Sequence, residues 1–219
     1  MIPDDPDEPH QPESTRHLNG APPSEPSPPL PPEEELEGMP AGVADLCASC
    51  VRYVTSKYGV PLDFTPDTLS VVDQYVRDAR AEILAKPQSL PLLQATVGAY
   101  VGEVIRRAHF GLWYAEGEHD AWRVQMTRVY LTFNPIGMVR EALTLAAAEG
   151  WHAHLEMDKV EREEVDRRLA ALPEVEESEF YAPSTRFDVV EIAVQSLAAQ
   201  MRSRGLGDVR FDKDDYHNR

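Results

Sequence analysis

Two histidines and a glutamate alternate along one short segment, as His152, His154 and Glu156. If this segment is a β-strand, alternate side chains point to the same face, so both imidazoles and the carboxylate project together. Two histidines and one carboxylate form the facial triad of some metal-dependent oxygenases. The opposite face of the segment is apolar, and the ordinary patterning of a half-exposed strand explains the same alternation. A metal-dependent enzyme is therefore the alternative hypothesis, while the main one assigns no metal, no cofactor and no catalytic residue.

The segment 98–107 has the most distinctive pattern, with two glycines four residues apart and an acid close to two arginines. Glycine costs about 1 kcal/mol in a helix interior, so Gly98 and Gly102 predict that a neighbouring element contacts this backbone closely. The acid is spaced to form an ion pair with either arginine on one helix. One interpretation is tight packing beside solvated charges. The other is a site for an anion or a partner's acidic side chain, with the candidate binding residues Glu103, Arg106, Arg107, Trp113 and Arg140.

Cys47 and Cys50 form a Cys-x-x-Cys pair. A thioredoxin-type pair needs its first thiol at a helix N-terminus after a strand, and zinc needs two further ligands at a recognised spacing. Here both cysteines lie on the apolar stripe of a predicted helix, which favours buried structural thiols. Two cysteines are also too few for a secreted disulfide framework.

Other catalytic signatures are missing from the sequence. It contains no glycine-rich phosphate loop followed by Lys-Ser/Thr, no Gly-x-Ser-x-Gly elbow and no His-Glu-x-x-His helix. Enzymatic activity is left open, with a non-enzyme as the expectation.

The pattern of apolar residues predicts the elements that position these side chains. Helical spacing alternates with short runs of β-branched and aromatic residues, which indicates an α+β domain with an antiparallel sheet of three to four strands. Asn134-Pro135 is a cap followed by a first-turn proline, and Thr185 with Asp188 predicts a capping box. Helices are expected near 43–58, 65–86, 89–110, 135–149, 158–172 and 185–205, and strands at 112–114, 122–126, 129–133 and 151–156.

The ends of the chain have a different composition. Twelve of the 19 prolines fall in the first forty residues, which also hold ten acids and one arginine. Such a segment cannot bury enough apolar surface to offset its ordering entropy. We therefore expect a disordered, acidic, proline-rich arm over residues 1–41, a folded domain over 42–205, and a loose polar tail over 206–219.

The net charge of the chain indicates which classes of partner its surface favours. The first forty residues contribute −9 of the formal −17, which leaves −8 for residues 41–219. An acidic surface repels nucleic acid and anionic membranes and favours basic proteins. No run of 18 apolar residues is present, and the N-terminus lacks the basic and apolar regions of a signal peptide. With the cysteine count, these features predict a cytoplasmic protein without nucleic-acid or membrane partners.

Several short motifs follow one another between residues 62 and 140. They are Leu62-Asp63-Phe64-Thr65, Gly98-Ala99-Tyr100 with Gly102-Glu103-Val104, Arg106-Arg107, Trp113, and Asn134-Pro135 with Val139-Arg140. This order resembles small uncharacterised bacterial domains, some of which are similar to immunity or accessory proteins of toxin systems. The resemblance covers about a third of the chain and implies a fold, since these domains have no established activity. The long arm and the helices after residue 158 depart from it.

These observations predict a protein-binding or regulatory module, such as an adaptor or an immunity-type protein, that engages a basic protein. The alternative function remains the metal-dependent enzyme built on the His-x-His-x-Glu segment. The oligomeric state is left open.

Overall fold

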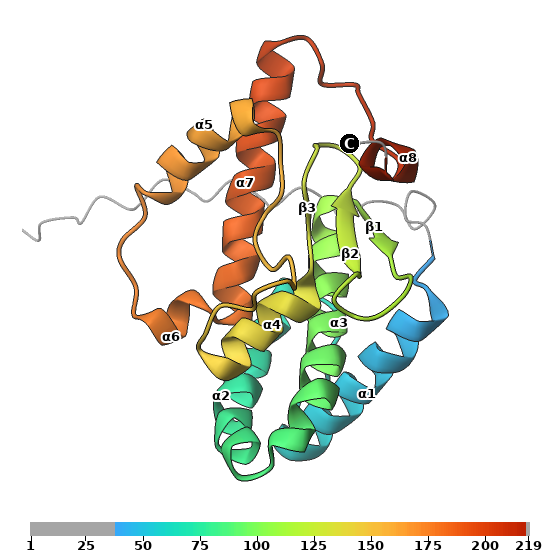
Figure 1. The fold of residues 1–219 in the computed structure, drawn as a ribbon, viewed down its shortest axis with the longest axis vertical. Coiled ribbons are helices and arrows are strands. Elements are labelled where there is room, and N and C mark those ends of the chain that lie inside the picture. The colour runs from blue at the N-terminus through green and yellow to red at the C-terminus, as the bar shows by residue number, and fades with distance from the viewer. Residues whose placement is uncertain (1–37, 218–219) are drawn as a thin grey trace, which may run out of the picture.

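Helix α3 (Leu90–His109) runs through the centre of the domain in the computed structural model, which describes residues 38–217 (Figure 1). Every residue of α3 from Leu93 to Arg106 is buried, because helices α1 and α4 pack closely against it. A helix surrounded in this way must be apolar or internally paired on all its faces. The predicted arm lies outside the described residues except for its last few positions.

Six helices of the described chain fall where the periodicity of the sequence predicts them, whereas the short helices Glu177–Phe180 and Lys213–His217 were not predicted. Short 3-10 turns at Pro66–Thr68 and Pro87–Ser89 precede α2 and α3. No helix between residues 38 and 217 has both the length and the apolar character needed to cross a membrane. The other helices are α1 (Ala41–Tyr58), α2 (Leu69–Ala85), α4 (Pro135–Thr144), α5 (Lys159–Leu169), α6 (Glu177–Phe180), α7 (Pro183–Ser203) and α8 (Lys213–His217).

The sheet is a three-stranded antiparallel meander in the order β1-β2-β3. Its strands are β1 (Gly111–Tyr114), β2 (Arg123–Met126) and β3 (Thr132–Phe133). Val124 lies opposite Trp113 on one side and Phe133 on the other, which aligns three buried apolar side chains across the sheet. The predicted α+β class with a short antiparallel sheet is confirmed (Figure 1).

The predicted fourth strand over residues 151–156 is not formed. Only one antiparallel bridge, between Thr132 and Glu156, joins this segment to β3. His152 has a φ of 49°, in the left-handed region that interrupts an extended strand. The peptide N–H of Asn134, just after β3, donates to the carbonyl of His152, so the segment contacts the sheet only at Thr132 and the start of α4 at Asn134.

The end of helix α4 also differs from expectation. Helix α4 ends at Thr144 rather than near residue 149, because Leu145 adopts a left-handed conformation with a φ of 53°. The carboxylate of Glu141 then accepts a hydrogen bond from the peptide N–H of Ala148, at 3.2 Å, and holds the departing chain.

The predicted capping box at the start of the last long helix is wrong. Helix α7 begins at Pro183, two residues before Thr185, with Ala182 as its N-cap and no side-chain cap. Proline fits this first position because its fixed φ suits a helix and it has no N–H to satisfy.

Asn134 forms the predicted cap of α4 and also ties that helix to the sheet. Its Oδ1 accepts from the peptide N–H groups of Ile136 and Gly137, at 2.9 and 3.1 Å. Its Nδ2 donates to the carbonyls of His119 and Asp120 in the turn between β1 and β2. One buried side chain thus fixes the position of α4 relative to the strands.

The C-terminal segment packs on the domain, which corrects the expectation of a loose tail. The hydroxyl of Tyr216 donates to the carbonyl of Met126 at 2.7 Å and accepts from the N–H of Leu131 at 3.1 Å. Its ring stacks on Tyr130, with centroids 4.8 Å apart. Phe211 also contacts Tyr130, and His217 contacts Tyr114. The sequence pattern missed these contacts because a few aromatic residues in a polar segment form no periodic pattern.

Candidate functional site

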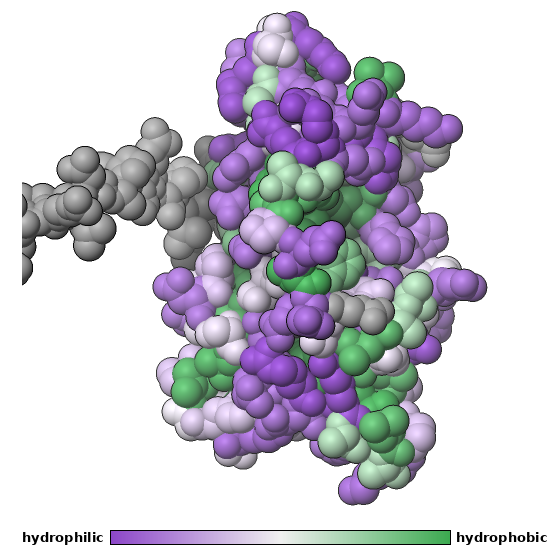
Figure 2. All heavy atoms as spheres, turned by 90° about the vertical axis from the view of Figure 1, so that its left-hand side faces the viewer, coloured by the Kyte–Doolittle hydropathy of each residue, from purple (hydrophilic) through white to green (hydrophobic). Residues whose placement is uncertain are grey.

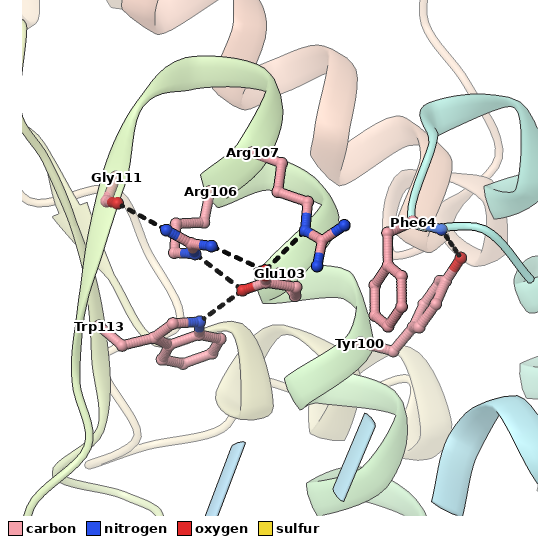
Figure 3. Close-up of polar contacts among 7 residues, drawn as sticks. All are labelled: Phe64, Tyr100, Glu103, Arg106, Arg107, Gly111 and Trp113. Atoms are coloured by element: carbon pink, nitrogen blue, oxygen red, sulfur yellow. Dashed lines mark hydrogen bonds and ion pairs between the residues drawn. The ribbon is translucent and has the colours of Figure 1, made fainter. Parts of the chain in front are cut away.

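Glu103 is the centre of a buried polar network on α3 (Figure 3). Its carboxylate forms a bidentate pair with Arg106, through Nε at 2.7 Å and Nη2 at 2.8 Å. The Nε of Arg107 donates to Oε1 at 2.7 Å, and the indole N–H of Trp113 donates to Oε2 at 3.0 Å. Both oxygens are therefore satisfied by protein donors, and the side chain is 0% exposed.

The donors decide the charge state of this carboxyl group. Burial alone would raise the pKa of Glu103, but the hydrogen bonds from Arg106, Arg107 and Trp113 and the charge of Arg106 lower it below its usual value. Because the pKa is lower in the folded than in the unfolded protein, the network stabilises the fold above the unfolded pKa, near 4.5. That contribution is lost as the pH falls through the lower folded pKa.

Most of the candidate binding residues are structural, because they belong to this buried network. Glu103, Arg106 and Trp113 are 4% exposed or less, so no partner reaches them without unfolding α3. The expectation that these charges are solvated is also wrong for Glu103 and Arg106, since that ion pair lies inside the protein. Arg107 keeps 37% of its side chain exposed. Arg140 donates to Gln94 at 2.9 Å and lies 5.3 Å from the ring of Trp151.

The two glycines allow the close contacts predicted from their spacing. A Cβ on Gly98 would lie 2.5 Å from the Cα of Ile136 at the start of α4. A Cβ on Gly102 would lie 2.5 Å from Trp113 and 2.6 Å from the ring of Pro135. Glycine at these positions lets α4 and β1 approach α3, and this approach brings the indole of Trp113 to Glu103.

Replacing Gly98 by alanine should lower the free energy of unfolding by about 1–3 kcal/mol, measured by urea denaturation. The clash with the backbone of α4 outweighs the roughly 1 kcal/mol that alanine gains in helix propensity. Gly42→Ala on α1 is the matched control, because its Cβ would lie 3.5 Å from Trp122, an ordinary contact. That variant should be unchanged or more stable, and equal losses in the two variants would contradict the explanation.

His152, His154 and Glu156 do not form one cluster. The Nδ1 of His152 lies 2.6 Å from a carboxylate oxygen of Glu156, whereas the Nε2 of His154 lies 3.9 Å from Glu141. The left-handed conformation at His152 removes the strand geometry that would have placed all three on one face. Among residues 38–217, no group of three or more His, Cys, Asp or Glu side chains is arranged to hold a metal ion.

Cys47 and Cys50 lie on the buried face of α1, as the sequence predicts, and are 1% and 0% exposed. They are not disulfide-bonded. Burial raises the pKa of both thiols, that of Cys50 to about 12. Thiols in this environment stay protonated at neutral pH and are poor nucleophiles.

A second buried ion pair, between α4 and α7, was not predicted from the sequence. The Nη2 of Arg186 donates to Glu141 at 2.7 Å, and the side chains are 6% and 1% exposed. The guanidinium also lies over the rings of Phe180 and Tyr181. The two partners are 45 residues apart on α4 and α7, so no local spacing could have indicated the pair.

A surface hollow of about 770 Å³ lies beside β3, where the segment after Glu156 meets the end of α7. Three of its lining residues are acidic and two are basic. Glu161 accepts from Arg204 at 3.0 Å, and Glu156, which contacts the imidazole of His152 through one oxygen, is about half exposed. The hollow is lined by Tyr130, Thr132, Glu156, Met157, Asp158, Lys159, Val160, Glu161 and Arg204.

The fold and these sites define a helix-rich α+β domain with two buried ion pairs, Glu103–Arg106 and Glu141–Arg186, among its described residues. No family model, curated protein or solved structure matches this chain.

Proposed function

We propose that this chain is a cytoplasmic protein-binding or regulatory module, of the adaptor or immunity type, whose acidic surface engages a basic protein. The hollow beside β3 is the observation that carries the proposal. Its exposed carboxylate, Glu156, and the neighbouring Asp158 line a cavity large enough for several side chains of a partner. An arginine of the partner can form a bidentate pair with a carboxylate in such a site.

Acidic side chains continue outward from the hollow. Glu163 and Asp166 are exposed on α5, and Glu174 and Glu176 are exposed in the loop that follows it. Hydrophilic residues predominate on the face that carries α5 and α6, and smaller hydrophobic patches interrupt them (Figure 2). A surface of this kind steers basic proteins toward it, and salt screens the attraction.

The arrangement of the arginines argues against nucleic acid as the partner. Binding to DNA or RNA needs clustered cations that are free to contact phosphates. Arg106 and Arg107 pair with Glu103, and Arg167 and Arg168 pair with Glu164. The two densest basic pairs of the described chain are therefore each neutralised in part by a carboxylate.

Charge reversal at the hollow tests the proposal. Immobilised Glu156→Lys protein should bind the partner captured by the wild type roughly tenfold more weakly, measured by quantitative pull-down from the native organism and then with the purified partner. Glu82→Lys, an exposed reversal on α2, is the matched control and should bind as the wild type does. Capture by the wild type should also fall as the salt concentration rises.

Three results would contradict this function. They are capture that is indifferent to salt, equal losses in the Glu156 and Glu82 variants, and a mobility shift of DNA or RNA at physiological ionic strength.

A further inference from the structure

An apolar groove of about 650 Å³ runs along α1 and shares no lining residue with the hollow beside β3. Phe64 forms part of its wall and is held in place by its peptide N–H, which donates to the hydroxyl of Tyr100 at 3.0 Å (Figure 3). Among the described residues that line the groove, Arg52 alone is charged. The lining residues are Met39, Ala44, Cys47, Ala48, Val51, Arg52, Thr55, Ser56 and Phe64.

We propose that this groove is the docking site of residues 30–36 of the same chain. The described chain begins at Gly38, and the next residue, Met39, lines the groove. The preceding sequence therefore starts at the wall of the groove. A Cβ added to Gly38 would meet nothing within 4 Å, so the backbone has room there to reverse and run back along α1.

The length of the segment matches the length of the groove. From Ala44 to Ser56, α1 rises about 18 Å at 1.5 Å per residue. The sequence Leu30-Pro31-Pro32-Glu33-Glu34-Glu35-Leu36 spans about 19 Å in the polyproline II conformation that its prolines favour. After a reversal at Gly38, Leu36 would come level with the start of α1, and Leu30 would extend toward the Ser56 end.

The chemistry of the segment matches as well. Two leucines suit the apolar floor, and the three glutamates between them give the segment a charge opposite to that of Arg52, the cation among the lining residues. The guanidinium of Arg107 lies 4.4 Å from the centre of the Phe64 ring, but its charge is already paired with Glu103, so Arg52 is the cation that the segment would meet. The covalent connection gives the segment a high effective concentration, about millimolar for short linkers, so these contacts suffice without tight intrinsic affinity.

A spin label on the full-length chain tests this docking. The variant Ser27→Cys can be labelled selectively, since both native thiols are buried. In the amide spectrum of the 15N-labelled chain, the signals of residues 52–56 should lose half or more of their intensity. Adding Leu30→Ser and Leu36→Ser should restore them, whereas adding Leu18→Ser, outside the segment, should leave the loss unchanged. Arg52→Glu should weaken the effect.

Two outcomes would overturn the inference. Full intensity at residues 52–56 in the labelled chain would show that the groove is not occupied by this segment. Broadening of a 15N chain by a separate spin-labelled chain would show that a second copy occupies it. Neither readout involves the basic partner, so a failure here is distinguishable from a failure of the proposed function.

Discussion

Replacing Glu103 by glutamine is expected to lower the free energy of unfolding by about 3–5 kcal/mol. Glutamine has nearly the same shape but no charge, so Arg106 stays buried without its counter-ion. The amide also presents an N–H₂ group to donors of Arg106, Arg107 or Trp113 where the carboxylate presented an acceptor. Urea denaturation measures the loss, and the dependence of the unfolding free energy on urea concentration is compared between the variants.

The chain contains a matched control for this variant. Glu164 precedes Arg167 and Arg168 with the same spacing, in the sequence Glu-Val-Asp-Arg-Arg instead of Glu-Val-Ile-Arg-Arg. It pairs with both arginines, but on the outer face of α5, where their side chains are 73% and 43% exposed. Glu164→Gln should therefore change stability little. A similar loss in both variants would show that burial does not explain the effect.

Stability should fall as the pH is lowered from about 6.5 to about 4, and His109 should account for about 3 kcal/mol of that fall. Burial lowers the pKa of this imidazole from 6.5 to about 4, and its ring packs against Phe187 with centroids 5.2 Å apart. In this pH window the unfolded chain binds a proton at His109 and the folded chain does not. Acid consequently favours the unfolded state.

His109→Phe should remove this contribution while keeping an aromatic ring against Phe187. The measurement is the free energy of unfolding at pH 7, 5.5 and 4.5 for both proteins, and the difference between them isolates His109 from the carboxyl groups. His154→Gln changes a side chain that is 75% exposed. Its unfolding free energy should depend on pH as that of the wild type does. If the unfolding free energy of His109→Phe fell with pH as steeply as that of the wild type, other groups would be responsible for the acid sensitivity.

Local sequence determined much of the fold. The helical stripes, the cap at Asn134 and the meander follow from residues near one another in the chain, so periodicity and capping rules predict them. The close approach at Gly98 and Gly102 was also predictable, because glycine in a helix interior costs free energy unless a neighbour needs the space.

The tertiary structure alone decided what the charged residues do. The motifs at Glu103 and Glu164 are nearly identical, yet the first is buried under Trp113 and the second lies at the surface beside two largely exposed arginines. The contact between Glu141 and Arg186, the docking of Tyr216 and the interruption at His152 likewise depend on residues distant in sequence. Spacing along a helix determines which side chains can pair, but burial depends on which element packs over them, and that is a property of the whole fold.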